Sequence, residues 1–207
     1  MDEYKEIKRE MRTVYLHDQR PWMIGFSGGK DSTLLCQLVF EMLEDLPEHL
    51  RWKKVYIVTS DTLVENPIVK TYMHRMSRAI NAASQKKKLN VEAHMIYPDV
   101  KDTFWSLVIG LGYPTPQPPG FRWCTERLKI NPMNTYVNER IKESGEIIIL
   151  LGVRKGESLT RQKTITAREI EGKLLNMHND IPNAYVYNPI TEIPNDLVWE
   201  FLLKGNC

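Results

Sequence analysis

The sequence is poor in the features that mark disulfide-rich, metal-binding or membrane proteins. Its three cysteines, Cys36, Cys124 and Cys207, are far apart and form no Cys-x-x-Cys pair, which argues against a disulfide framework. No apolar run reaches about 18 residues and the first twenty residues are charged and polar, so neither a membrane helix nor a signal peptide is predicted. We expect a cytoplasmic protein with no membrane partner.

The chain also lacks a strong excess of charge of either sign. A net charge of +2 is too small to mark a nucleic-acid-binding protein, so any contact with DNA or RNA must come from local patches. The triplet Lys86–Lys88 is one such patch, and Arg161–Lys163 is another. Both patches are equally well explained as solvated surface, and the sequence leaves the two interpretations open.

The most informative stretch runs from an apolar strand, residues 22–26, through a short turn into a helix. The helix carries apolar residues at the 3.6-residue period of a helix packed on one side. The turn and the helix start consist of Ser27, Gly28, Gly29, Lys30, Asp31 and Ser32. Consecutive glycines allow a tight turn, and the free N–H groups of a helix start favour an anion. With two hydroxyls and a lysine added, the stretch predicts a phosphate-binding loop; the alternative is a turn whose glycines serve only the chain reversal.

Strands and helices alternate along most of the chain, which is typical of a parallel sheet with right-handed crossovers. The predicted strands are 22–26, 54–59, 91–97, 146–152 and 185–190. The predicted helices are 2–17, 30–43, 67–88, 103–109, 132–143 and one from residue 195. We expect Asn66 and Asn131, each followed by proline, to cap helices, and Asp102 to cap the short helix. The prediction is an α/β fold with a parallel sheet of about five strands flanked by helices. Residues 1–20 form a helical lead-in and residues 21–207 a single domain.

Ligands of parallel sheets bind beyond the carboxyl ends of the strands. This rule brings together Ser27–Ser32, Ser60–Thr62, Tyr97–Asp99 and Gly152–Glu157. Asp61, directly after a strand, could accept a hydrogen bond from a ribose or an adenine. The alternative for Asp61 is a helix-capping role.

Two groups of cations suit a reaction at a phosphate: one follows the Gly/Pro-rich stretch 110–120, and the other follows the predicted strand 146–152. Arg122, Lys129 and Arg154 could stabilise the charge that develops when pyrophosphate leaves. Mg²⁺ is expected to share this task, yet no carboxylate cluster identifies its ligands, and Asp31 and Asp61 are both possible. Neighbouring cations favour the thiolate form of a cysteine at position 124, whereas a buried structural cysteine is the alternative.

Several motifs resemble a known superfamily. Ser27–Ser32 resembles the PP-loop of ATP pyrophosphatases, which cleave ATP between its α and β phosphates and whose superfamily includes phosphoadenylyl-sulfate reductases. The longer motifs at 60–67, 102–105, 121–129 and 151–158 are similar to those of the DndC and SspD families of DNA phosphorothioation. The resemblance covers the chain from about Arg20 onward.

The resemblance implies a PP-loop adenine-nucleotide alpha-hydrolase-like fold and an ATP pyrophosphatase and sulfurtransferase. It would use ATP to activate a DNA phosphate, release AMP and pyrophosphate, and replace a non-bridging oxygen by sulfur. The implied partners are DNA, a cysteine desulfurase that donates persulfide sulfur, and other phosphorothioation subunits. The residues assigned to the nucleotide are Ser27, Gly28, Gly29, Lys30, Asp31, Ser32, Asp61, Arg122, Lys129, Gly152 and Arg154. The residues assigned to catalysis are Lys30, Asp31, Cys124 and Arg154, with Cys124 handling sulfur or ligating a cluster.

One departure from the family pattern concerns the end of the sequence. Members of these families are expected to continue further and to carry an iron–sulfur cluster on several cysteines. We therefore expect this chain to be truncated at its C-terminus or to be a shorter relative, with a cluster only in a longer form. Two other functions stay open: a reductase of adenylylated sulfate, and a non-catalytic nucleotide-binding subunit of a DNA-modification complex.

Overall fold

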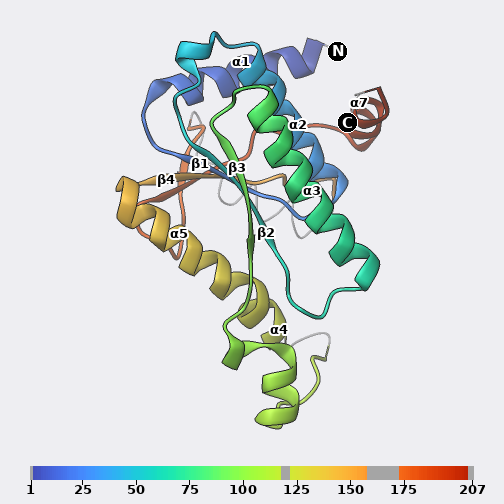
Figure 1. The fold of residues 1–207 in the computed structure, drawn as a ribbon. Coiled ribbons are helices and arrows are strands. Elements are labelled where there is room, and N and C mark those ends of the chain that lie inside the picture. The colour runs from blue at the N-terminus through green and yellow to red at the C-terminus, as the bar shows by residue number, and fades with distance from the viewer. Residues whose placement is uncertain (1, 118–121, 158–172, 205–207) are drawn as a thin grey trace.

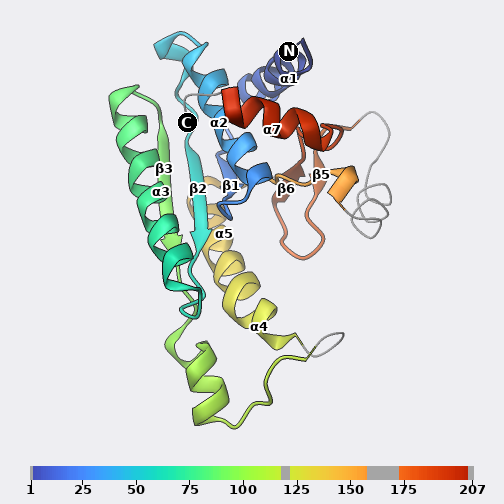
Figure 2. The same ribbon diagram turned by 90° about the vertical axis from the view of Figure 1, so that its right-hand side faces the viewer.

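The computed structural model describes residues 2–117, 122–157 and 173–204. A six-stranded sheet runs through the centre in the order β3-β2-β1-β4-β6-β5 (Figures 1 and 2). The strands are β1 (Trp22–Gly25), β2 (Val55–Ser60), β3 (Val91–Ile96), β4 (Ile147–Leu150), β5 (Asn176–Met177) and β6 (Ala184–Tyr187). Five neighbouring strands are parallel, and the short β5 is antiparallel to β6. The predicted α/β fold is confirmed, and β5 is an edge strand that the sequence analysis missed.

The α-helices are α1 (Asp2–His17), α2 (Lys30–Glu44), α3 (Pro67–Lys86), α4 (Trp123–Thr125), α5 (Asn131–Ser144) and α7 (Asn195–Lys204). The short helical turns are η1 (Glu48–Leu50), η2 (Val100–Asp102), η3 (Ser106–Gly110), η4 (Glu126–Ile130) and η5 (Lys155–Glu157), of which η3 and η4 are π-helical. Helices α1, α2, α3 and α7 cover one face of the sheet and α5 covers the other (Figure 2).

The central strands are buried on both faces, and their side chains alternate between two cores. Trp22 and Ile24 of β1 enter the core under α1, α2 and α7, whereas Met23 enters the core under α5. This alternation is the period of two of a β-strand. The burial explains why β1 and β4 read as nearly continuous apolar runs. The first helix packs on the domain, since Met11 and Tyr15 are fully buried.

One predicted helix start is wrong. Asn66 caps α3 as expected, through a hydrogen bond of 2.9 Å from the backbone N–H of Ile68, but Asn131, the first residue of α5, caps no helix. The chain is helical without a break from α4 through η4 into α5. Pro132 lacks the N–H that would bond the carbonyl of Leu128, and the Ser60 hydroxyl donates to that carbonyl at 3.2 Å instead. A π-turn before the proline therefore allows one continuous helix.

The short helix near residue 103 is capped by a different residue from the one predicted. The Thr103 hydroxyl accepts the N–H of Ser106 at 3.3 Å. Asp102 instead accepts a hydrogen bond of 3.0 Å from Arg127, which joins η2 to η4. The Gly/Pro-rich stretch that follows η3 is irregular over residues 111–116.

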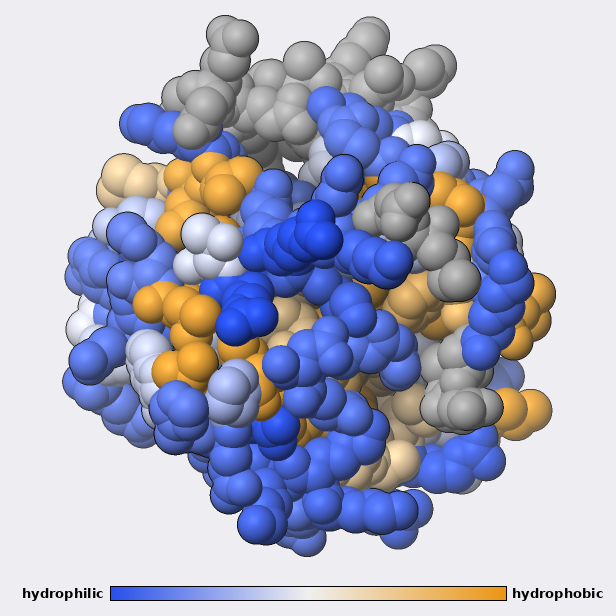
Figure 3. Space-filling view, turned by 90° about the horizontal axis from the view of Figure 1, so that it is seen from above, coloured by the Kyte–Doolittle hydropathy of each residue, from blue (hydrophilic) through white to orange (hydrophobic). Residues whose placement is uncertain are grey.

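The face at the amino ends of the strands is mainly hydrophilic, with apolar residues in separate patches (Figure 3). The lysine triplet closes α3 at this end of the molecule (Figure 1). Lys87 pairs with Glu44, and the Lys88 ammonium lies 3.6 Å from a carboxylate oxygen of Glu48. Arg161–Lys163 lies outside the described residues. Within the described ranges, no helix is long and apolar enough to cross a membrane.

Candidate functional site

The loop between β1 and α2 has the backbone geometry of an anion site. Gly28 has a φ of +71°, and a Cβ there would lie 2.7 Å from the sulfur of Met73, so the position requires glycine. Gly29 precedes the helix in an extended conformation, and among the described residues no side chain caps the first turn of α2. The first-turn N–H groups thus stay open to a ligand at the positive end of the helix.

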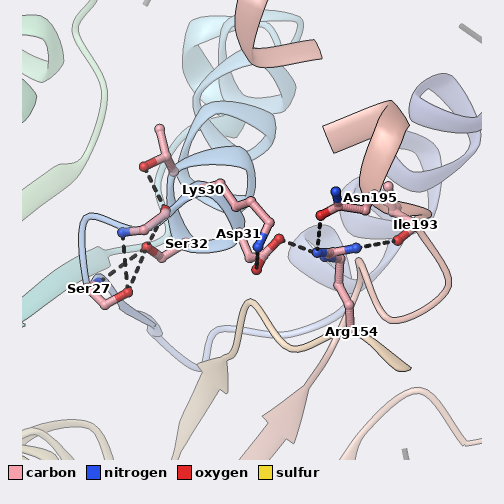
Figure 4. Close-up of polar contacts among 9 residues, drawn as sticks. Ser27, Lys30, Asp31, Ser32, Arg154, Ile193 and Asn195 are labelled. Atoms are coloured by element: carbon pink, nitrogen blue, oxygen red, sulfur yellow. Dashed lines mark hydrogen bonds and ion pairs between the residues drawn. The ribbon is translucent and has the colours of Figure 1, made fainter. Parts of the chain in front are cut away.

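The two serines of the loop bond each other and fix its shape (Figure 4). Their hydroxyl oxygens are 3.2 Å apart, and the Ser27 N–H donates to the Ser32 oxygen at 3.3 Å. The Ser32 hydroxyl donates to the Gly29 carbonyl at 3.0 Å. Ser32 is buried and Ser27 is exposed, so Ser27 is the hydroxyl that solvent or a ligand reaches.

Asp31 lies in the first turn of α2 and contacts two cations (Figure 4). One carboxylate oxygen accepts the Arg154 Nε–H at 2.6 Å, and the other accepts from the Lys30 ammonium at 3.2 Å. Burial alone raises the pKa of the Asp31 carboxyl. The hydrogen bonds and charges of Arg154 and Lys30 outweigh burial and place the pKa below its usual value. Asp31 is therefore a carboxylate at neutral pH.

Arg154 follows β4 and reaches across to α2. Its residue surface is 1% exposed. Besides Asp31, its guanidinium donates to the Ile193 carbonyl at 3.0 Å and to the side-chain oxygen of Asn195 at 3.2 Å. Each of its three side-chain nitrogens thus has a protein acceptor. The structure brings Arg154 to the loop, as the sequence predicts, but by way of Asp31.

Gly152 is the point at which the β4 loop touches α2. A Cβ at this position would lie 3.0 Å from the carbonyl carbon and oxygen of Asp31 and 3.1 Å from the nitrogen of Ser32. These are backbone atoms, which cannot move aside as a side chain does. Gly152 therefore permits the loop after β4 to pack directly against the backbone at the start of α2, and this is its contribution to the site.

A cavity of about 330 Å³ opens beside the loop, between α3 and the η4–α5 helix. Its wall is mostly apolar, and its polar lining includes Ser27, Ser60, Asp61, Glu65, Lys70 and Lys129. Lys129 lies 3.6 Å from a carboxylate oxygen of Glu65 and its side chain is 56% exposed. The size and the apolar lining suit a small organic group such as a nucleobase.

Asp61 is the buried polar group of this cavity, at 3% exposure. One carboxylate oxygen accepts the Leu63 N–H at 2.8 Å, and the other has no hydrogen-bond partner among the described residues. The Lys70 ammonium and the His74 ring lie 3.8 and 3.4 Å from that second oxygen. Because Asn66 caps the adjacent helix, the helix-capping alternative for Asp61 is wrong. A buried acceptor without a donor is suited to bind a ligand hydroxyl or amino group.

The remaining predicted residues lie elsewhere in the fold. Arg122 is exposed just before α4, and Cys124 is partly exposed on α4; neither lines the cavity. Tyr97–Asp99 lines a second hollow, of about 530 Å³, on the side of α5. Ser158, the last residue of the 151–158 motif, and Cys207 lie outside the described residues.

The expected Mg²⁺ ligands are only partly supported by the geometry. In the part of the chain that the structure describes, no three His, Cys, Asp or Glu side chains gather into a metal-binding group. Both oxygens of Asp31 already accept from cations, so Asp31 does not fit as a ligand. One oxygen of Asp61 accepts no hydrogen bond from the described residues, with the Lys70 ammonium 3.8 Å away, so Asp61 is the better fit of the two.

Sequence analysis missed Lys70, His74 and Asn195. Lys70 and His74 are one helical turn apart on α3 and thus share a face, a signal that becomes readable only once Asp61 is known to lie beneath them. Asn195 is separated from Arg154 by 41 positions, and nothing in the local sequence links the two.

Comparison with solved structures shows the same fold in nucleotide enzymes. The chain matches a phosphoadenylyl-sulfate reductase of Candida auris at a TM-score of 0.55 and 12% identity, over 97% of this chain and 84% of that one. It matches a U34-tRNA thiolase of Methanococcus maripaludis, solved with a [4Fe-4S] cluster, at a TM-score of 0.55 and 18% identity. That match covers 98% of this chain and 65% of the thiolase. An FMN adenylyltransferase of Candida glabrata matches at a TM-score of 0.52 and 13% identity, over 98% of this chain and 58% of the adenylyltransferase.

The sequence comparisons identify a family. An uncharacterised protein of Methanocaldococcus jannaschii is 25% identical over 202 residues, which are 94% of this chain and 34% of that protein. The chain thus spans about a third of the length of this curated relative. The model of the phosphoadenosine phosphosulfate reductase domain matches residues 21–207. The chain therefore belongs to the phosphoadenosine phosphosulfate reductase domain family, within the PP-loop nucleotide-binding proteins.

Proposed function

We propose that this chain is an ATP pyrophosphatase that activates a DNA phosphate for phosphorothioation. The observation that carries the proposal is the pairing of an uncapped α2 start with a cavity lined by Asp61, one of whose buried oxygens accepts no hydrogen bond from the described residues. The first can hold the β and γ phosphates and the second the adenosine. The α-phosphate of ATP would then lie between them, near Lys30.

Each residue has a defined task in this reaction. Asp61 accepts a hydrogen bond from the adenosine, and the N–H groups of α2 with Lys30 stabilise the departing pyrophosphate. Lys129, on the opposite side of the cavity, adds positive charge where the acceptor phosphate approaches. Mg²⁺ bound with ATP would supply further charge neutralisation.

The DNA step follows from the chemistry of the phosphate. A non-bridging oxygen of the DNA attacks the α-phosphorus, and pyrophosphate leaves. A persulfide from a cysteine desulfurase then attacks the DNA phosphorus, and AMP departs with the displaced oxygen. A second thiol cleaves the S–S bond as a disulfide forms, which leaves sulfur on the DNA. We assign sulfur handling to Cys124, which is partly exposed.

A second function is favoured by the family itself, whose description names reduction of phosphoadenosine phosphosulfate. In that reaction the loop and cavity would hold a sulfonucleotide, and a thiol would release sulfite from it. A third function, nucleotide binding without turnover within a DNA-modification complex, uses the same site.

Product analysis separates these functions. ATP turnover is measured with and without DNA, resolving AMP and pyrophosphate from ADP and phosphate, for the wild type, Lys30→Ala and the control Lys87→Ala. AMP and pyrophosphate, lost only in Lys30→Ala, support the proposal. ADP and phosphate overturn it. Thiol-dependent sulfite release from adenylylated sulfate indicates the reductase, and ATP binding without turnover, even with DNA and partners, indicates the binding subunit.

A further inference from the structure

Lys30, the lysine of the phosphate-binding loop, is held by Asp31. Its ammonium donates to one carboxylate oxygen of Asp31 at 3.2 Å (Figure 4). Asp31 competes with a phosphate for this ammonium, so Lys30 gives its full charge to the phosphate only when it leaves Asp31. Its departure would leave a largely buried carboxylate, which is costly unless another cation neutralises it.

Arg154 is that second cation. It donates to the other oxygen of Asp31 at 2.6 Å. Its side chain is 2% exposed, against 27% for Lys30, and its two remaining nitrogens are bonded to residues 193 and 195. A guanidinium fixed at all three nitrogens stays in place, whereas a lysine on a flexible, part-exposed stem can move.

We propose that Arg154 is a positioning residue that neutralises Asp31 and so frees Lys30 to bind the nucleotide phosphates. Lys30 has two positions, on Asp31 without ligand and on phosphate with it. Asn195 and the carbonyl of Ile193 anchor Arg154, so the turn before α7 supports the loop. The inference rests on the proposed nucleotide site at Ser27–Ser32 and concerns the control of its lysine.

The opposite role, direct binding of phosphate by Arg154, leads to a different prediction. If Arg154 acts through Asp31, its loss leaves the full carboxylate charge to hold Lys30, and removing that charge as well releases Lys30 again. If Arg154 itself binds phosphate, removing the charge of Asp31 restores nothing. The double variant therefore separates the two roles.

The test measures ATP affinity by titration calorimetry, with thermal unfolding alongside. We expect Arg154→Gln to weaken ATP binding roughly tenfold, the scale of one hydrogen bond to a charged group. In Arg154→Gln with Asp31→Asn, affinity returns to within about threefold of the wild type. Arg154→Lys, which keeps the charge, retains intermediate affinity.

The matched control is Arg51→Gln. Arg51 also donates from three nitrogens to protein carbonyls, at 2.9, 3.1 and 3.0 Å, but beyond the far end of α2. Its loss should lower the unfolding temperature and leave ATP affinity unchanged.

Two outcomes overturn the inference. The first is a double variant that binds ATP as weakly as Arg154→Gln. Should the Arg154 variants fail to fold, Asp31→Asn alone decides: affinity at or above that of the wild type supports the inference, and a tenfold loss overturns it. A wild-type protein that binds no ATP instead refutes the proposed function, so the two failures are distinguishable.

Discussion

Replacing Gly152 by alanine tests whether the close approach of the β4 loop to α2 positions the phosphate-binding loop. The added Cβ would lie 3.0 Å from backbone atoms of Asp31, closer than ordinary van der Waals contact. Overpacking of this kind typically costs about 1–3 kcal/mol. The lower entropy of the unfolded chain returns roughly 0.4–1 kcal/mol. We expect a net loss of about 1–2 kcal/mol in the free energy of unfolding.

The assay is thermal unfolding together with ATP titration. For a chain of this size the loss corresponds to a fall of about 2–8 °C in the unfolding temperature. ATP affinity should fall as well, because the backbone that must give way is that of the first turn of α2. Gly156→Ala is the control, since the Cβ position of Gly156 has no neighbouring heavy atom within 4 Å in the described ranges. The reasoning is refuted if Gly152→Ala matches Gly156→Ala in both measurements.

Three further predictions concern other contacts of the site. Asp61→Asn should weaken ATP binding roughly tenfold in calorimetry, because the acceptor oxygen of this cavity-lining residue that has no donor can become an amide nitrogen; unchanged affinity would contradict an adenosine contact there. Ser60→Ala should lower the free energy of unfolding by about 1–2 kcal/mol in denaturant titrations, since the Leu128 carbonyl loses its donor; a neutral effect would show that water replaces it. The folded state lowers the pKa of Asp31, so the contribution of Asp31 to the free energy of unfolding should be full above about pH 4. That contribution should be lost as the pH drops through the folded-state pKa. Arg154→Gln should flatten that dependence, and an unaltered pH profile would exclude the pairing.

The elements with a strong local signal were predictable from the sequence. The Ser27–Ser32 loop is recognisable because a tight turn, a free helix start and an anion site all require residue types that are adjacent in the chain. Asn66 was predictable for the same reason, since a cap and its helix are neighbours. Asn131 carries the same local signal and gives the wrong answer, because Ser60, 68 positions before Leu128, donates to the Leu128 carbonyl that Pro132 cannot serve.

The sequence by itself determined the α/β class, the positions of the main strands along the chain and the end of the sheet at which the site lies. These follow from hydrophobic periodicity and from the geometry of parallel sheets, which are local or general properties. Only the tertiary structure decided what the charged residues do. It bonds Arg154 to Asp31 and Asn195, places Lys70 over Asp61, and leaves Arg122 outside the cavity. The physical reason is that the partner of a buried charge is set by packing between distant segments, which no local pattern of residues records.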